Sequence, residues 1–237
     1  MDAFIGSYDG RLRYYKNTGS ALTPIFTLQT GSANPLDVMF PVFSNVAPAF
    51  VDIDGDGDMD AFIGSYEAYN GAISYYKNTG TASAPVFAQQ SGAANPFVVA
   101  NVGDYPIPTF LDIDGDGDMD AFIGELYGEI IYYKNTGTRS APVFTLQTGA
   151  ADPFDGVAVS DFSAPAFVDI DGDGDIDAFI GAGDGTISYY KNTTTVTPCN
   201  WSGAVNNNWE NPDNWSCGFV PGPNADVILS VCKKTLL

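Results

Sequence analysis

The sequence predicts an all-β protein, a β-propeller built from four-stranded antiparallel blades. Three observations favour this fold class. One acidic segment of nine residues occurs three times: from Asp52 to Asp112 is 60 residues, and from Asp112 to Asp169 is 57. Each repeat carries four short strand signals separated by turn residues, and no segment shows a sustained helical period. A period of this length with four strands is typical of a propeller blade. A β-sandwich is the alternative, but it would not explain near-identical units.

The strand signals follow one order in every repeat. A Pro-containing apolar segment comes first, then the acidic segment, then a second strand that starts at its last aspartate. A turn such as Asp9-Gly10 leads to the third strand, and an Asn-Thr-Gly turn leads to the fourth. The expected first strands are 47–52, 107–112 and 164–169, the second 60–64, the third 73–78, 131–135 and 187–192, and the fourth 85–90 and 142–147.

The two ends of the repeat region are expected to lie inside blades. Residues 1–6 repeat residues 59–64, so the chain is expected to start part-way through a blade, with Asp2 left over from a fourth acidic loop. The last unit stops after its third strand, at Asn192. The sequence thus predicts sheets of three, four, four and three strands. The expected units are about 1–44, 45–104, 105–162 and 163–195, followed by a partial module at 196–237.

The acidic segments predict metal sites. Each places aspartates at every second position, and like charges so close together repel unless a cation neutralises them. Calcium fits best because it accepts six to eight oxygen ligands in flexible geometry, whereas magnesium wants stricter octahedral geometry. A solvated acidic hairpin without an ion is the alternative. The candidate ligands are Asp52, Asp54, Asp56, Asp58 and Asp60, then Asp112, Asp114, Asp116, Asp118 and Asp120, then Asp169, Asp171, Asp173, Asp175 and Asp177.

The sites are not expected to be EF-hands. Position twelve of an EF-hand loop is a glutamate, but here it is Ile63, Ile123 or Ile180, inside an expected strand. About three Ca2+ ions per chain are therefore expected in β-hairpin loops. Their repetition in successive units favours a structural role, one ion for each blade.

Composition narrows the function classes. The net charge of -20 argues against a nucleic acid partner or an anionic membrane surface, and three Ca2+ ions would reduce it to -14. The chain has no His, the commonest general base, and no recognisable nucleophile motif, so no catalytic residue is assigned. No apolar run is long enough to insert into a membrane. The cysteines (Cys199, Cys217 and Cys232) lie near the end and allow one disulfide with one thiol left over.

A Tyr-Tyr-Lys-Asn motif ends the third strand of each repeat. Adjacent strand residues face opposite ways, so one tyrosine is expected between blades and the other nearer solvent. The lysines are expected to offset nearby acidic charge. They are Lys16, Lys77, Lys134 and Lys191.

The acidic loop and the Phe-Ile-Gly that follows it resemble the FG-GAP or VCBS repeat family, calcium-loop propellers related to the N-terminal head of integrin α subunits. The carrying segments are 52–64, 112–124 and 169–181, and the resemblance covers about residues 1–195. It implies about half of a seven-bladed ring. It also implies that the aspartates at positions one, three, five and nine of each loop bind the ion through side chains and that Asp58, Asp118 and Asp175 offer backbone carbonyls. Residues 196–237 resemble the opening of a Trp/Asn-rich β module of large secreted bacterial proteins.

The predicted topology places the acidic loops and the Asn-Thr-Gly turns on one face, and the variable connections on the other. Recognition usually occurs on variable loops of a rigid frame. The leading hypothesis is a non-catalytic, calcium-stabilised adhesion or binding module of an extracellular or cell-surface protein, with a protein or glycan ligand opposite the calcium loops. A lectin using Tyr66, Tyr69 and Tyr127 is the first alternative. A non-catalytic part of a secreted polysaccharide-degrading enzyme is the second.

Overall fold

The computed structural model describes residues 1–37, 45–67, 70–193, 199–201, 214 and 227–229. The first 193 residues form four antiparallel sheets with three, four, four and three strands, as predicted. The first sheet contains β1 (Ala3–Gly6), β2 (Leu12–Asn17) and β3 (Phe26–Gln29). The second contains β4 (Ala47–Val51), β5 (Asp60–Glu67), β6 (Asn70–Asn78) and β7 (Phe87–Gln90).

The last two sheets repeat this plan. The third contains β8 (Ile107–Leu111), β9 (Asp120–Gly124), β10 (Ile130–Asn135) and β11 (Phe144–Leu146). The fourth contains β12 (Ala164–Val168), β13 (Asp177–Gly181) and β14 (Ile187–Tyr190). Short 3-10 turns follow the outermost strands of the first three sheets: η1 (Gly31–Ala33), η2 (Gly92–Ala94) and η3 (Gly149–Ala151).

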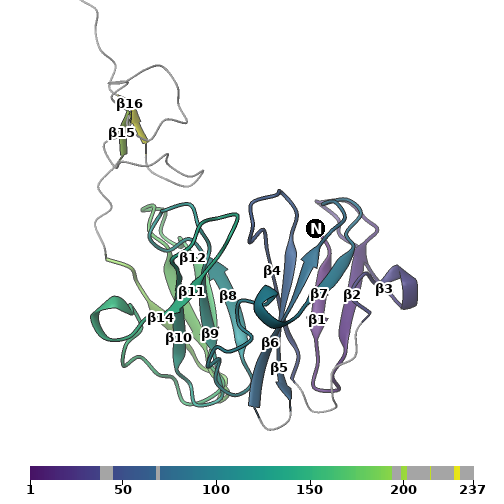
Figure 1. The fold of residues 1–237 in the computed structure, drawn as a ribbon, viewed down its shortest axis with the longest axis horizontal. Helices are drawn as coiled ribbons and strands as arrows, with labels where there is room; N and C mark the ends of the chain where they lie inside the picture. The colour runs from purple at the N-terminus through teal and green to yellow at the C-terminus, as the bar shows by residue number, and fades with distance from the viewer. Residues whose placement is uncertain (38–44, 68–69, 194–198, 202–213, 215–226, 230–237) are drawn as a thin grey trace, which may run out of the picture.

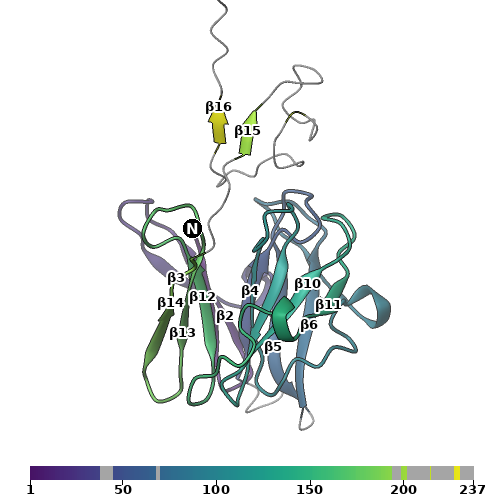
Figure 2. The ribbon, with the colours of Figure 1, turned by 90° about the vertical axis from the view of Figure 1, so that its left-hand side faces the viewer.

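The sheets follow one another in space as they do in sequence (Figure 1). In Figure 2 the first and last sheets lie to the left of the two middle sheets, so the row of sheets is curved. The first strands of successive blades pack together, and Thr109 Oγ1 in β8 donates a hydrogen bond of 3.0 Å to the Pro165 carbonyl in β12. This arrangement is that of successive propeller blades.

The second strand of each middle blade is buried on both faces. Ala61, Phe62 and Ile63 have no exposed surface, and neither have their counterparts in β9. Because neighbouring blades cover both faces, the strand is a continuous apolar run instead of an alternating one. For the same reason one expectation is wrong: in the middle blades both tyrosines of the Tyr-Tyr-Lys-Asn motif are buried, Tyr75 at 8% and Tyr76 at 7% exposure.

The long connections between blades supply much of the core. After η2 the chain inserts Phe97, which is 3% exposed, between the second and third blades. Its ring lies 5.9 Å from Phe62 on one side and 4.7 Å from Phe144 on the other. The equivalent residues Leu36 and Phe154 are buried in the same way. These connections therefore bind each blade to the next.

Beyond the fourth sheet, β15 (Cys199–Trp201) and β16 (Val227–Leu229) pair in parallel. The expected partial β module at 196–237 lies mostly outside the described residues, as do Cys217 and Cys232. No helix in the described part of the chain is both long and apolar enough to span a membrane.

Candidate metal centres

Each acidic loop joins the first two strands of its blade. In the second blade the loop starts after β4 and returns at β5, where Val51 pairs with Asp60. Gly57 has φ of 92°, and its counterparts Gly117 and Gly174 have 92° and 93°. This left-handed conformation favours glycine and lets the loop wrap tightly. The loop is thus a closed hairpin with fixed ends.

The first three aspartates of each loop converge. Asp52, Asp54 and Asp56 each offer a carboxylate oxygen, and these atoms lie within 4.8 Å of one another. The same holds for the two other loops, through Asp112, Asp114 and Asp116 and through Asp169, Asp171 and Asp173. Nine of the fifteen predicted ligands are therefore brought into three clusters of carboxylates.

Backbone N–H groups of the loop orient these carboxylates. The Gly57 N–H donates to Asp52 Oδ2 at 3.2 Å, and the Asp58 N–H donates to Asp56 Oδ1 at 3.0 Å. Equivalent bonds run from Gly117 to Asp112 at 2.9 Å and from Gly174 to Asp169 at 3.1 Å. The loop therefore curls around its own side chains, and the first aspartate is half-enclosed by the chain that follows it.

The aspartate at position nine of each loop lies in a different environment from the clusters. Asp60 is 1% exposed, and it accepts hydrogen bonds from the Asn78 N–H at 2.6 Å and the Tyr75 hydroxyl at 3.1 Å. Burial raises the pKa of Asp60 to about 6, although these two hydrogen bonds act to lower it. A carboxylate has about four lone-pair sites, so these contacts leave room for a metal bond. The ligand role of Asp60, Asp120 and Asp177 stays a prediction, as does the carbonyl role of Asp58, Asp118 and Asp175.

The tyrosine and asparagine that bind the aspartate at loop position nine are site residues that the sequence interpretation missed. Asp120 is bound in the same way by Asn135 at 2.7 Å and Tyr132 at 3.3 Å. Asp177 is bound by Asn192 at 2.8 Å and Tyr189 at 3.1 Å. The available signal was that Tyr-Tyr-Lys-Asn accompanies the acidic loop in every repeat.

Asp2 has the same partners in the first blade. It accepts hydrogen bonds from the Tyr14 hydroxyl at 2.6 Å and from the Asn17 N–H at 2.9 Å. Asp2 therefore corresponds to Asp60, the aspartate at loop position nine, as the match between residues 1–6 and 59–64 predicts.

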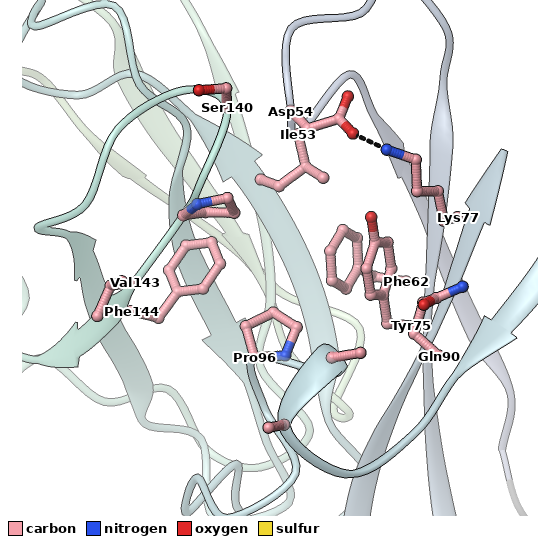
Figure 3. A pocket seen from close by; sticks show the side chains of 13 residues that line it. Ile53, Asp54, Phe62, Tyr75, Lys77, Gln90, Pro96, Ser140, Val143 and Phe144 are labelled. Atoms are coloured by element: carbon pink, nitrogen blue, oxygen red, sulfur yellow. Dashed lines mark hydrogen bonds and ion pairs between the residues drawn. The ribbon is translucent and has the colours of Figure 1, made fainter. Parts of the chain in front are cut away.

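Two kinds of basic side chain lie against the clusters. The Lys77 ammonium pairs with Asp54 Oδ2, as Figure 3 shows, and Lys134 and Lys191 pair with Asp114 and Asp171. The Arg139 guanidinium reaches Asp52 Oδ2 at 3.1 Å from the neighbouring blade. Burial raises the pKa of Asp54, but the Lys77 contact outweighs it, so this pKa lies below its ordinary value.

The donor set fits a hard divalent cation. All the converging groups are carboxylates, the ligands that calcium prefers. Asp52 Oδ1 is buried and has no hydrogen-bond partner among the described residues. A buried carboxylate oxygen without a partner is costly, and a metal ion would satisfy it.

The comparisons with known proteins identify the repeats. The model of the FG-GAP-like repeat family matches residues 52–123 and 112–180, which together span more than half of the chain. None of the curated proteins compared matches the chain. Both matched ranges start at the first aspartate of an acidic loop and end in the strand after the next loop. The chain therefore belongs to the FG-GAP-like repeat family.

Proposed function

We propose that this chain is a non-catalytic binding module whose three acidic loops hold structural calcium. The observation that carries the proposal is the convergence of three aspartates in each of three equivalent loops, with donor atoms within 4.8 Å. Each loop joins the first two strands of a blade, at the end of the sheet opposite the connection between its second and third strands. Calcium would hold Asp52, Asp54 and Asp56 together and neutralise them, and it would supply no reaction chemistry.

Calcium titration tests the metal part of this proposal. We expect the calcium-free protein to bind about three Ca2+ ions in calorimetry. Calcium at 100 times Kd should stabilise the fold by about 2.7 kcal/mol per site, because the ion binds the folded loop and not the unfolded chain. Removal of calcium should lower the melting temperature, and added calcium should restore it.

Two triple variants make the titration specific. Asp54→Asn/Asp114→Asn/Asp171→Asn removes one carboxylate from each cluster and should abolish most binding. The control Asp37→Asn/Asp155→Asn/Asp184→Asn removes the same charge from exposed positions outside the loops and should bind calcium like the wild type. Equal melting curves of the wild type with and without calcium would contradict the proposal.

We further propose that a protein or glycan ligand binds on the face opposite the calcium loops, in an extracellular or cell-surface setting. There the β1–β2 connection and the ends of the blade connections surround a hollow of about 230 Å3, lined by Ser7, Tyr8, Tyr105 and Phe162 among others. Calcium loops of modest affinity suit the millimolar-range calcium found outside cells.

The aromatic groups around this hollow suit a glycan ligand. Tyr66 stacks on Tyr105 at 4.2 Å between ring centroids, and Phe162 lies 5.7 Å from Tyr105. Tyr105 and Phe162 have φ of 53° and 45°, a region that bulky residues rarely adopt and that often marks functional sites. Of the lectin candidates, Tyr127 is 70% exposed and Tyr69 lies outside the described residues.

A glycan array with two variants tests this ligand class. If the wild type binds a glycan and this binding is lost in Tyr8→Ala but kept in Tyr127→Ala, the glycan site is the hollow, because Tyr8 lines it. The opposite pattern would place the glycan site at the β9–β10 connection, which carries Tyr127. A wild type that binds no glycan on the array contradicts the glycan ligand and leaves the protein ligand.

A further inference from the structure

Each acidic loop already has a cation of its own. Lys77 Nζ pairs with Asp54 Oδ2 and lies 3.8 Å from Asp56 Oδ2. Lys134 Nζ pairs with Asp114 and lies 3.7 Å from Asp116 Oδ2. Lys191 Nζ pairs with Asp171 and lies 3.1 Å from Asp173 Oδ2. In all three loops one ammonium group therefore lies between the aspartates at loop positions three and five, which belong to the carboxylate cluster.

The third strand directs the lysine to this place. Tyr75 and Lys77 are two residues apart in β6 and so point to the same side of the strand. The Tyr75 hydroxyl reaches Asp60 at one end of the loop while Lys77 reaches Asp54 in its middle, and the Asn78 N–H fixes the strand to Asp60. Figure 3 shows Lys77 and Asp54 on the same side of the pocket, with Tyr75 pointing toward them.

We propose that Lys77, Lys134 and Lys191 are tethered counter-ions, which hold the acidic loops together in the calcium-free molecule and leave them when calcium binds. The inference rests on the proposed function, because it assigns calcium to these loops. It goes beyond that function by giving the lysines control over calcium affinity and over the stability of the calcium-free fold.

Electrostatics favours the exchange. An ammonium group and Ca2+ that share carboxylates would lie a few ångströms apart, and like charges at that distance repel strongly in a partly buried site. Calcium carries twice the charge and binds several oxygens at once, so the lysine is the group that leaves. The energy of the lysine–aspartate contact is lost in that step, so calcium affinity is lower than the carboxylates alone would provide.

The lysines have room to leave. The Lys77 side chain is 37% exposed, and Lys134 and Lys191 are 34% and 44% exposed. Lys77 also lines a hollow of about 430 Å3 between the second and third blades, with Gln90 and Ser140 as polar neighbours. Its four-carbon stem is flexible and its ammonium is readily hydrated, so it can turn from the loop to this hollow.

The first blade provides a matched control. Lys16 in β2 corresponds to Lys77 in β6, but none of the three described carboxylate clusters lies in its blade. Lys16→Gln removes the same charge from the same strand position without a carboxylate cluster beside it.

The test compares Lys77→Gln/Lys134→Gln/Lys191→Gln with Lys16→Gln and the wild type. Each protein is purified with calcium and then freed of it by dialysis. Removal of the repelling charge should tighten calcium binding by roughly tenfold per site in calorimetry. The calcium-free melting temperature of the triple variant should fall below that of the wild type, while Lys16→Gln changes neither quantity. Lys→Arg at the same three positions keeps the charge and should restore both.

Each outcome separates the two proposals. Calcium binding of equal or weaker affinity in the triple variant overturns the exchange alone, because the lysines would then support or ignore the loaded loops. If neither the wild type nor the triple variant binds calcium, the calcium assignment and the exchange are both overturned. If the triple variant does not fold without calcium, the single variant Lys191→Gln in the last blade gives the same two measurements, with the same expected directions.

Discussion

Glycine ends the Phe-Ile-Gly segment of each middle blade because the next blade passes too close for a side chain. A Cβ on Gly64 would lie 1.9 Å from the Pro106 carbonyl oxygen, and one on Gly124 would lie 2.1 Å from that of Ser163. Both obstacles are backbone atoms at the start of the following blade. At the residue scale, this glycine therefore sets how tightly two blades pack.

The last blade supplies the comparison that tests this role. A Cβ on Gly181 would lie 3.7 Å from Ala164 Cβ, an ordinary contact distance. We expect Gly64→Ala to lower the free energy of unfolding by about 3 kcal/mol or more, because a blade must move to accept the methyl group. Gly181→Ala should change it by less than about 1 kcal/mol. Denaturant unfolding in calcium measures both, and equal effects at the two positions would contradict the packing argument.

Residues that repeat with the acidic loop could be recognised from sequence, but their contacts could not. The spacing of the acidic segments and their resemblance to a repeat family predict fifteen aspartates as ligands. The structure brings nine of them into carboxylate clusters, and their binding of an ion stays a prediction. The hydroxyl of Tyr75 on Asp60 was missed, since the two residues lie 15 positions apart in different strands. A strand's register against its neighbour decides that contact, and periodicity does not specify register.

At the scale of elements, the hairpins could be predicted well because their signals are local. The expected second strand at 60–64 is found, but β5 continues to Glu67 and pairs with a longer β6 that begins at Asn70. The turn residues in this connection led to the expectation of shorter strands on both sides of it. Strand identity was therefore predictable, whereas strand length depended on the connection.

Contacts between blades show what sequence could not provide at this scale. The turn after β10 carries Arg139, whose guanidinium reaches Asp52 in the loop of the preceding blade, 87 positions away in sequence. A Cβ on Gly55 would lie 2.5 Å from Arg139 Nε, so the arginine also covers this loop. The contact agrees with the prediction that acidic loops and Asn-Thr-Gly turns share a face. The choice of the neighbouring loop as partner depends on how blades stack.

At the scale of the whole molecule, charge dominates the calcium-free state. The chain carries a net charge of -20, and much of it lies in the three loops. Three lysines and Arg139 offset only part of that charge within the clusters. Protons and calcium ions therefore compete for the same carboxylates, and pH should act in opposite directions with and without the metal.

Burial raises the pKa of Asp60 and of Asp120 to about 6, above the unfolded value of about 3.9. A raised pKa in the folded state contributes stability that is present below about pH 4 and lost as the pH rises through about 6. Asp54 and Asp173 have lowered pKa values, so their contribution is lost only at lower pH, below about 4. Between pH 7.5 and 5, the raised pair should thus control the calcium-free fold.

We therefore expect the melting temperature of the dialysed, calcium-free protein to rise as the pH falls from 7.5 to 5. In saturating calcium it should fall over the same range, because protons displace the ion from its carboxylates. Asp120→Asn should weaken the calcium-free trend, since an amide stays neutral at every pH, and Asp37→Asn at an exposed position should leave it unchanged. Scanning calorimetry at several pH values measures these slopes. A calcium-free melting temperature that falls with acidification in this range would show that the buried aspartates are already ionised and compensated in the folded molecule.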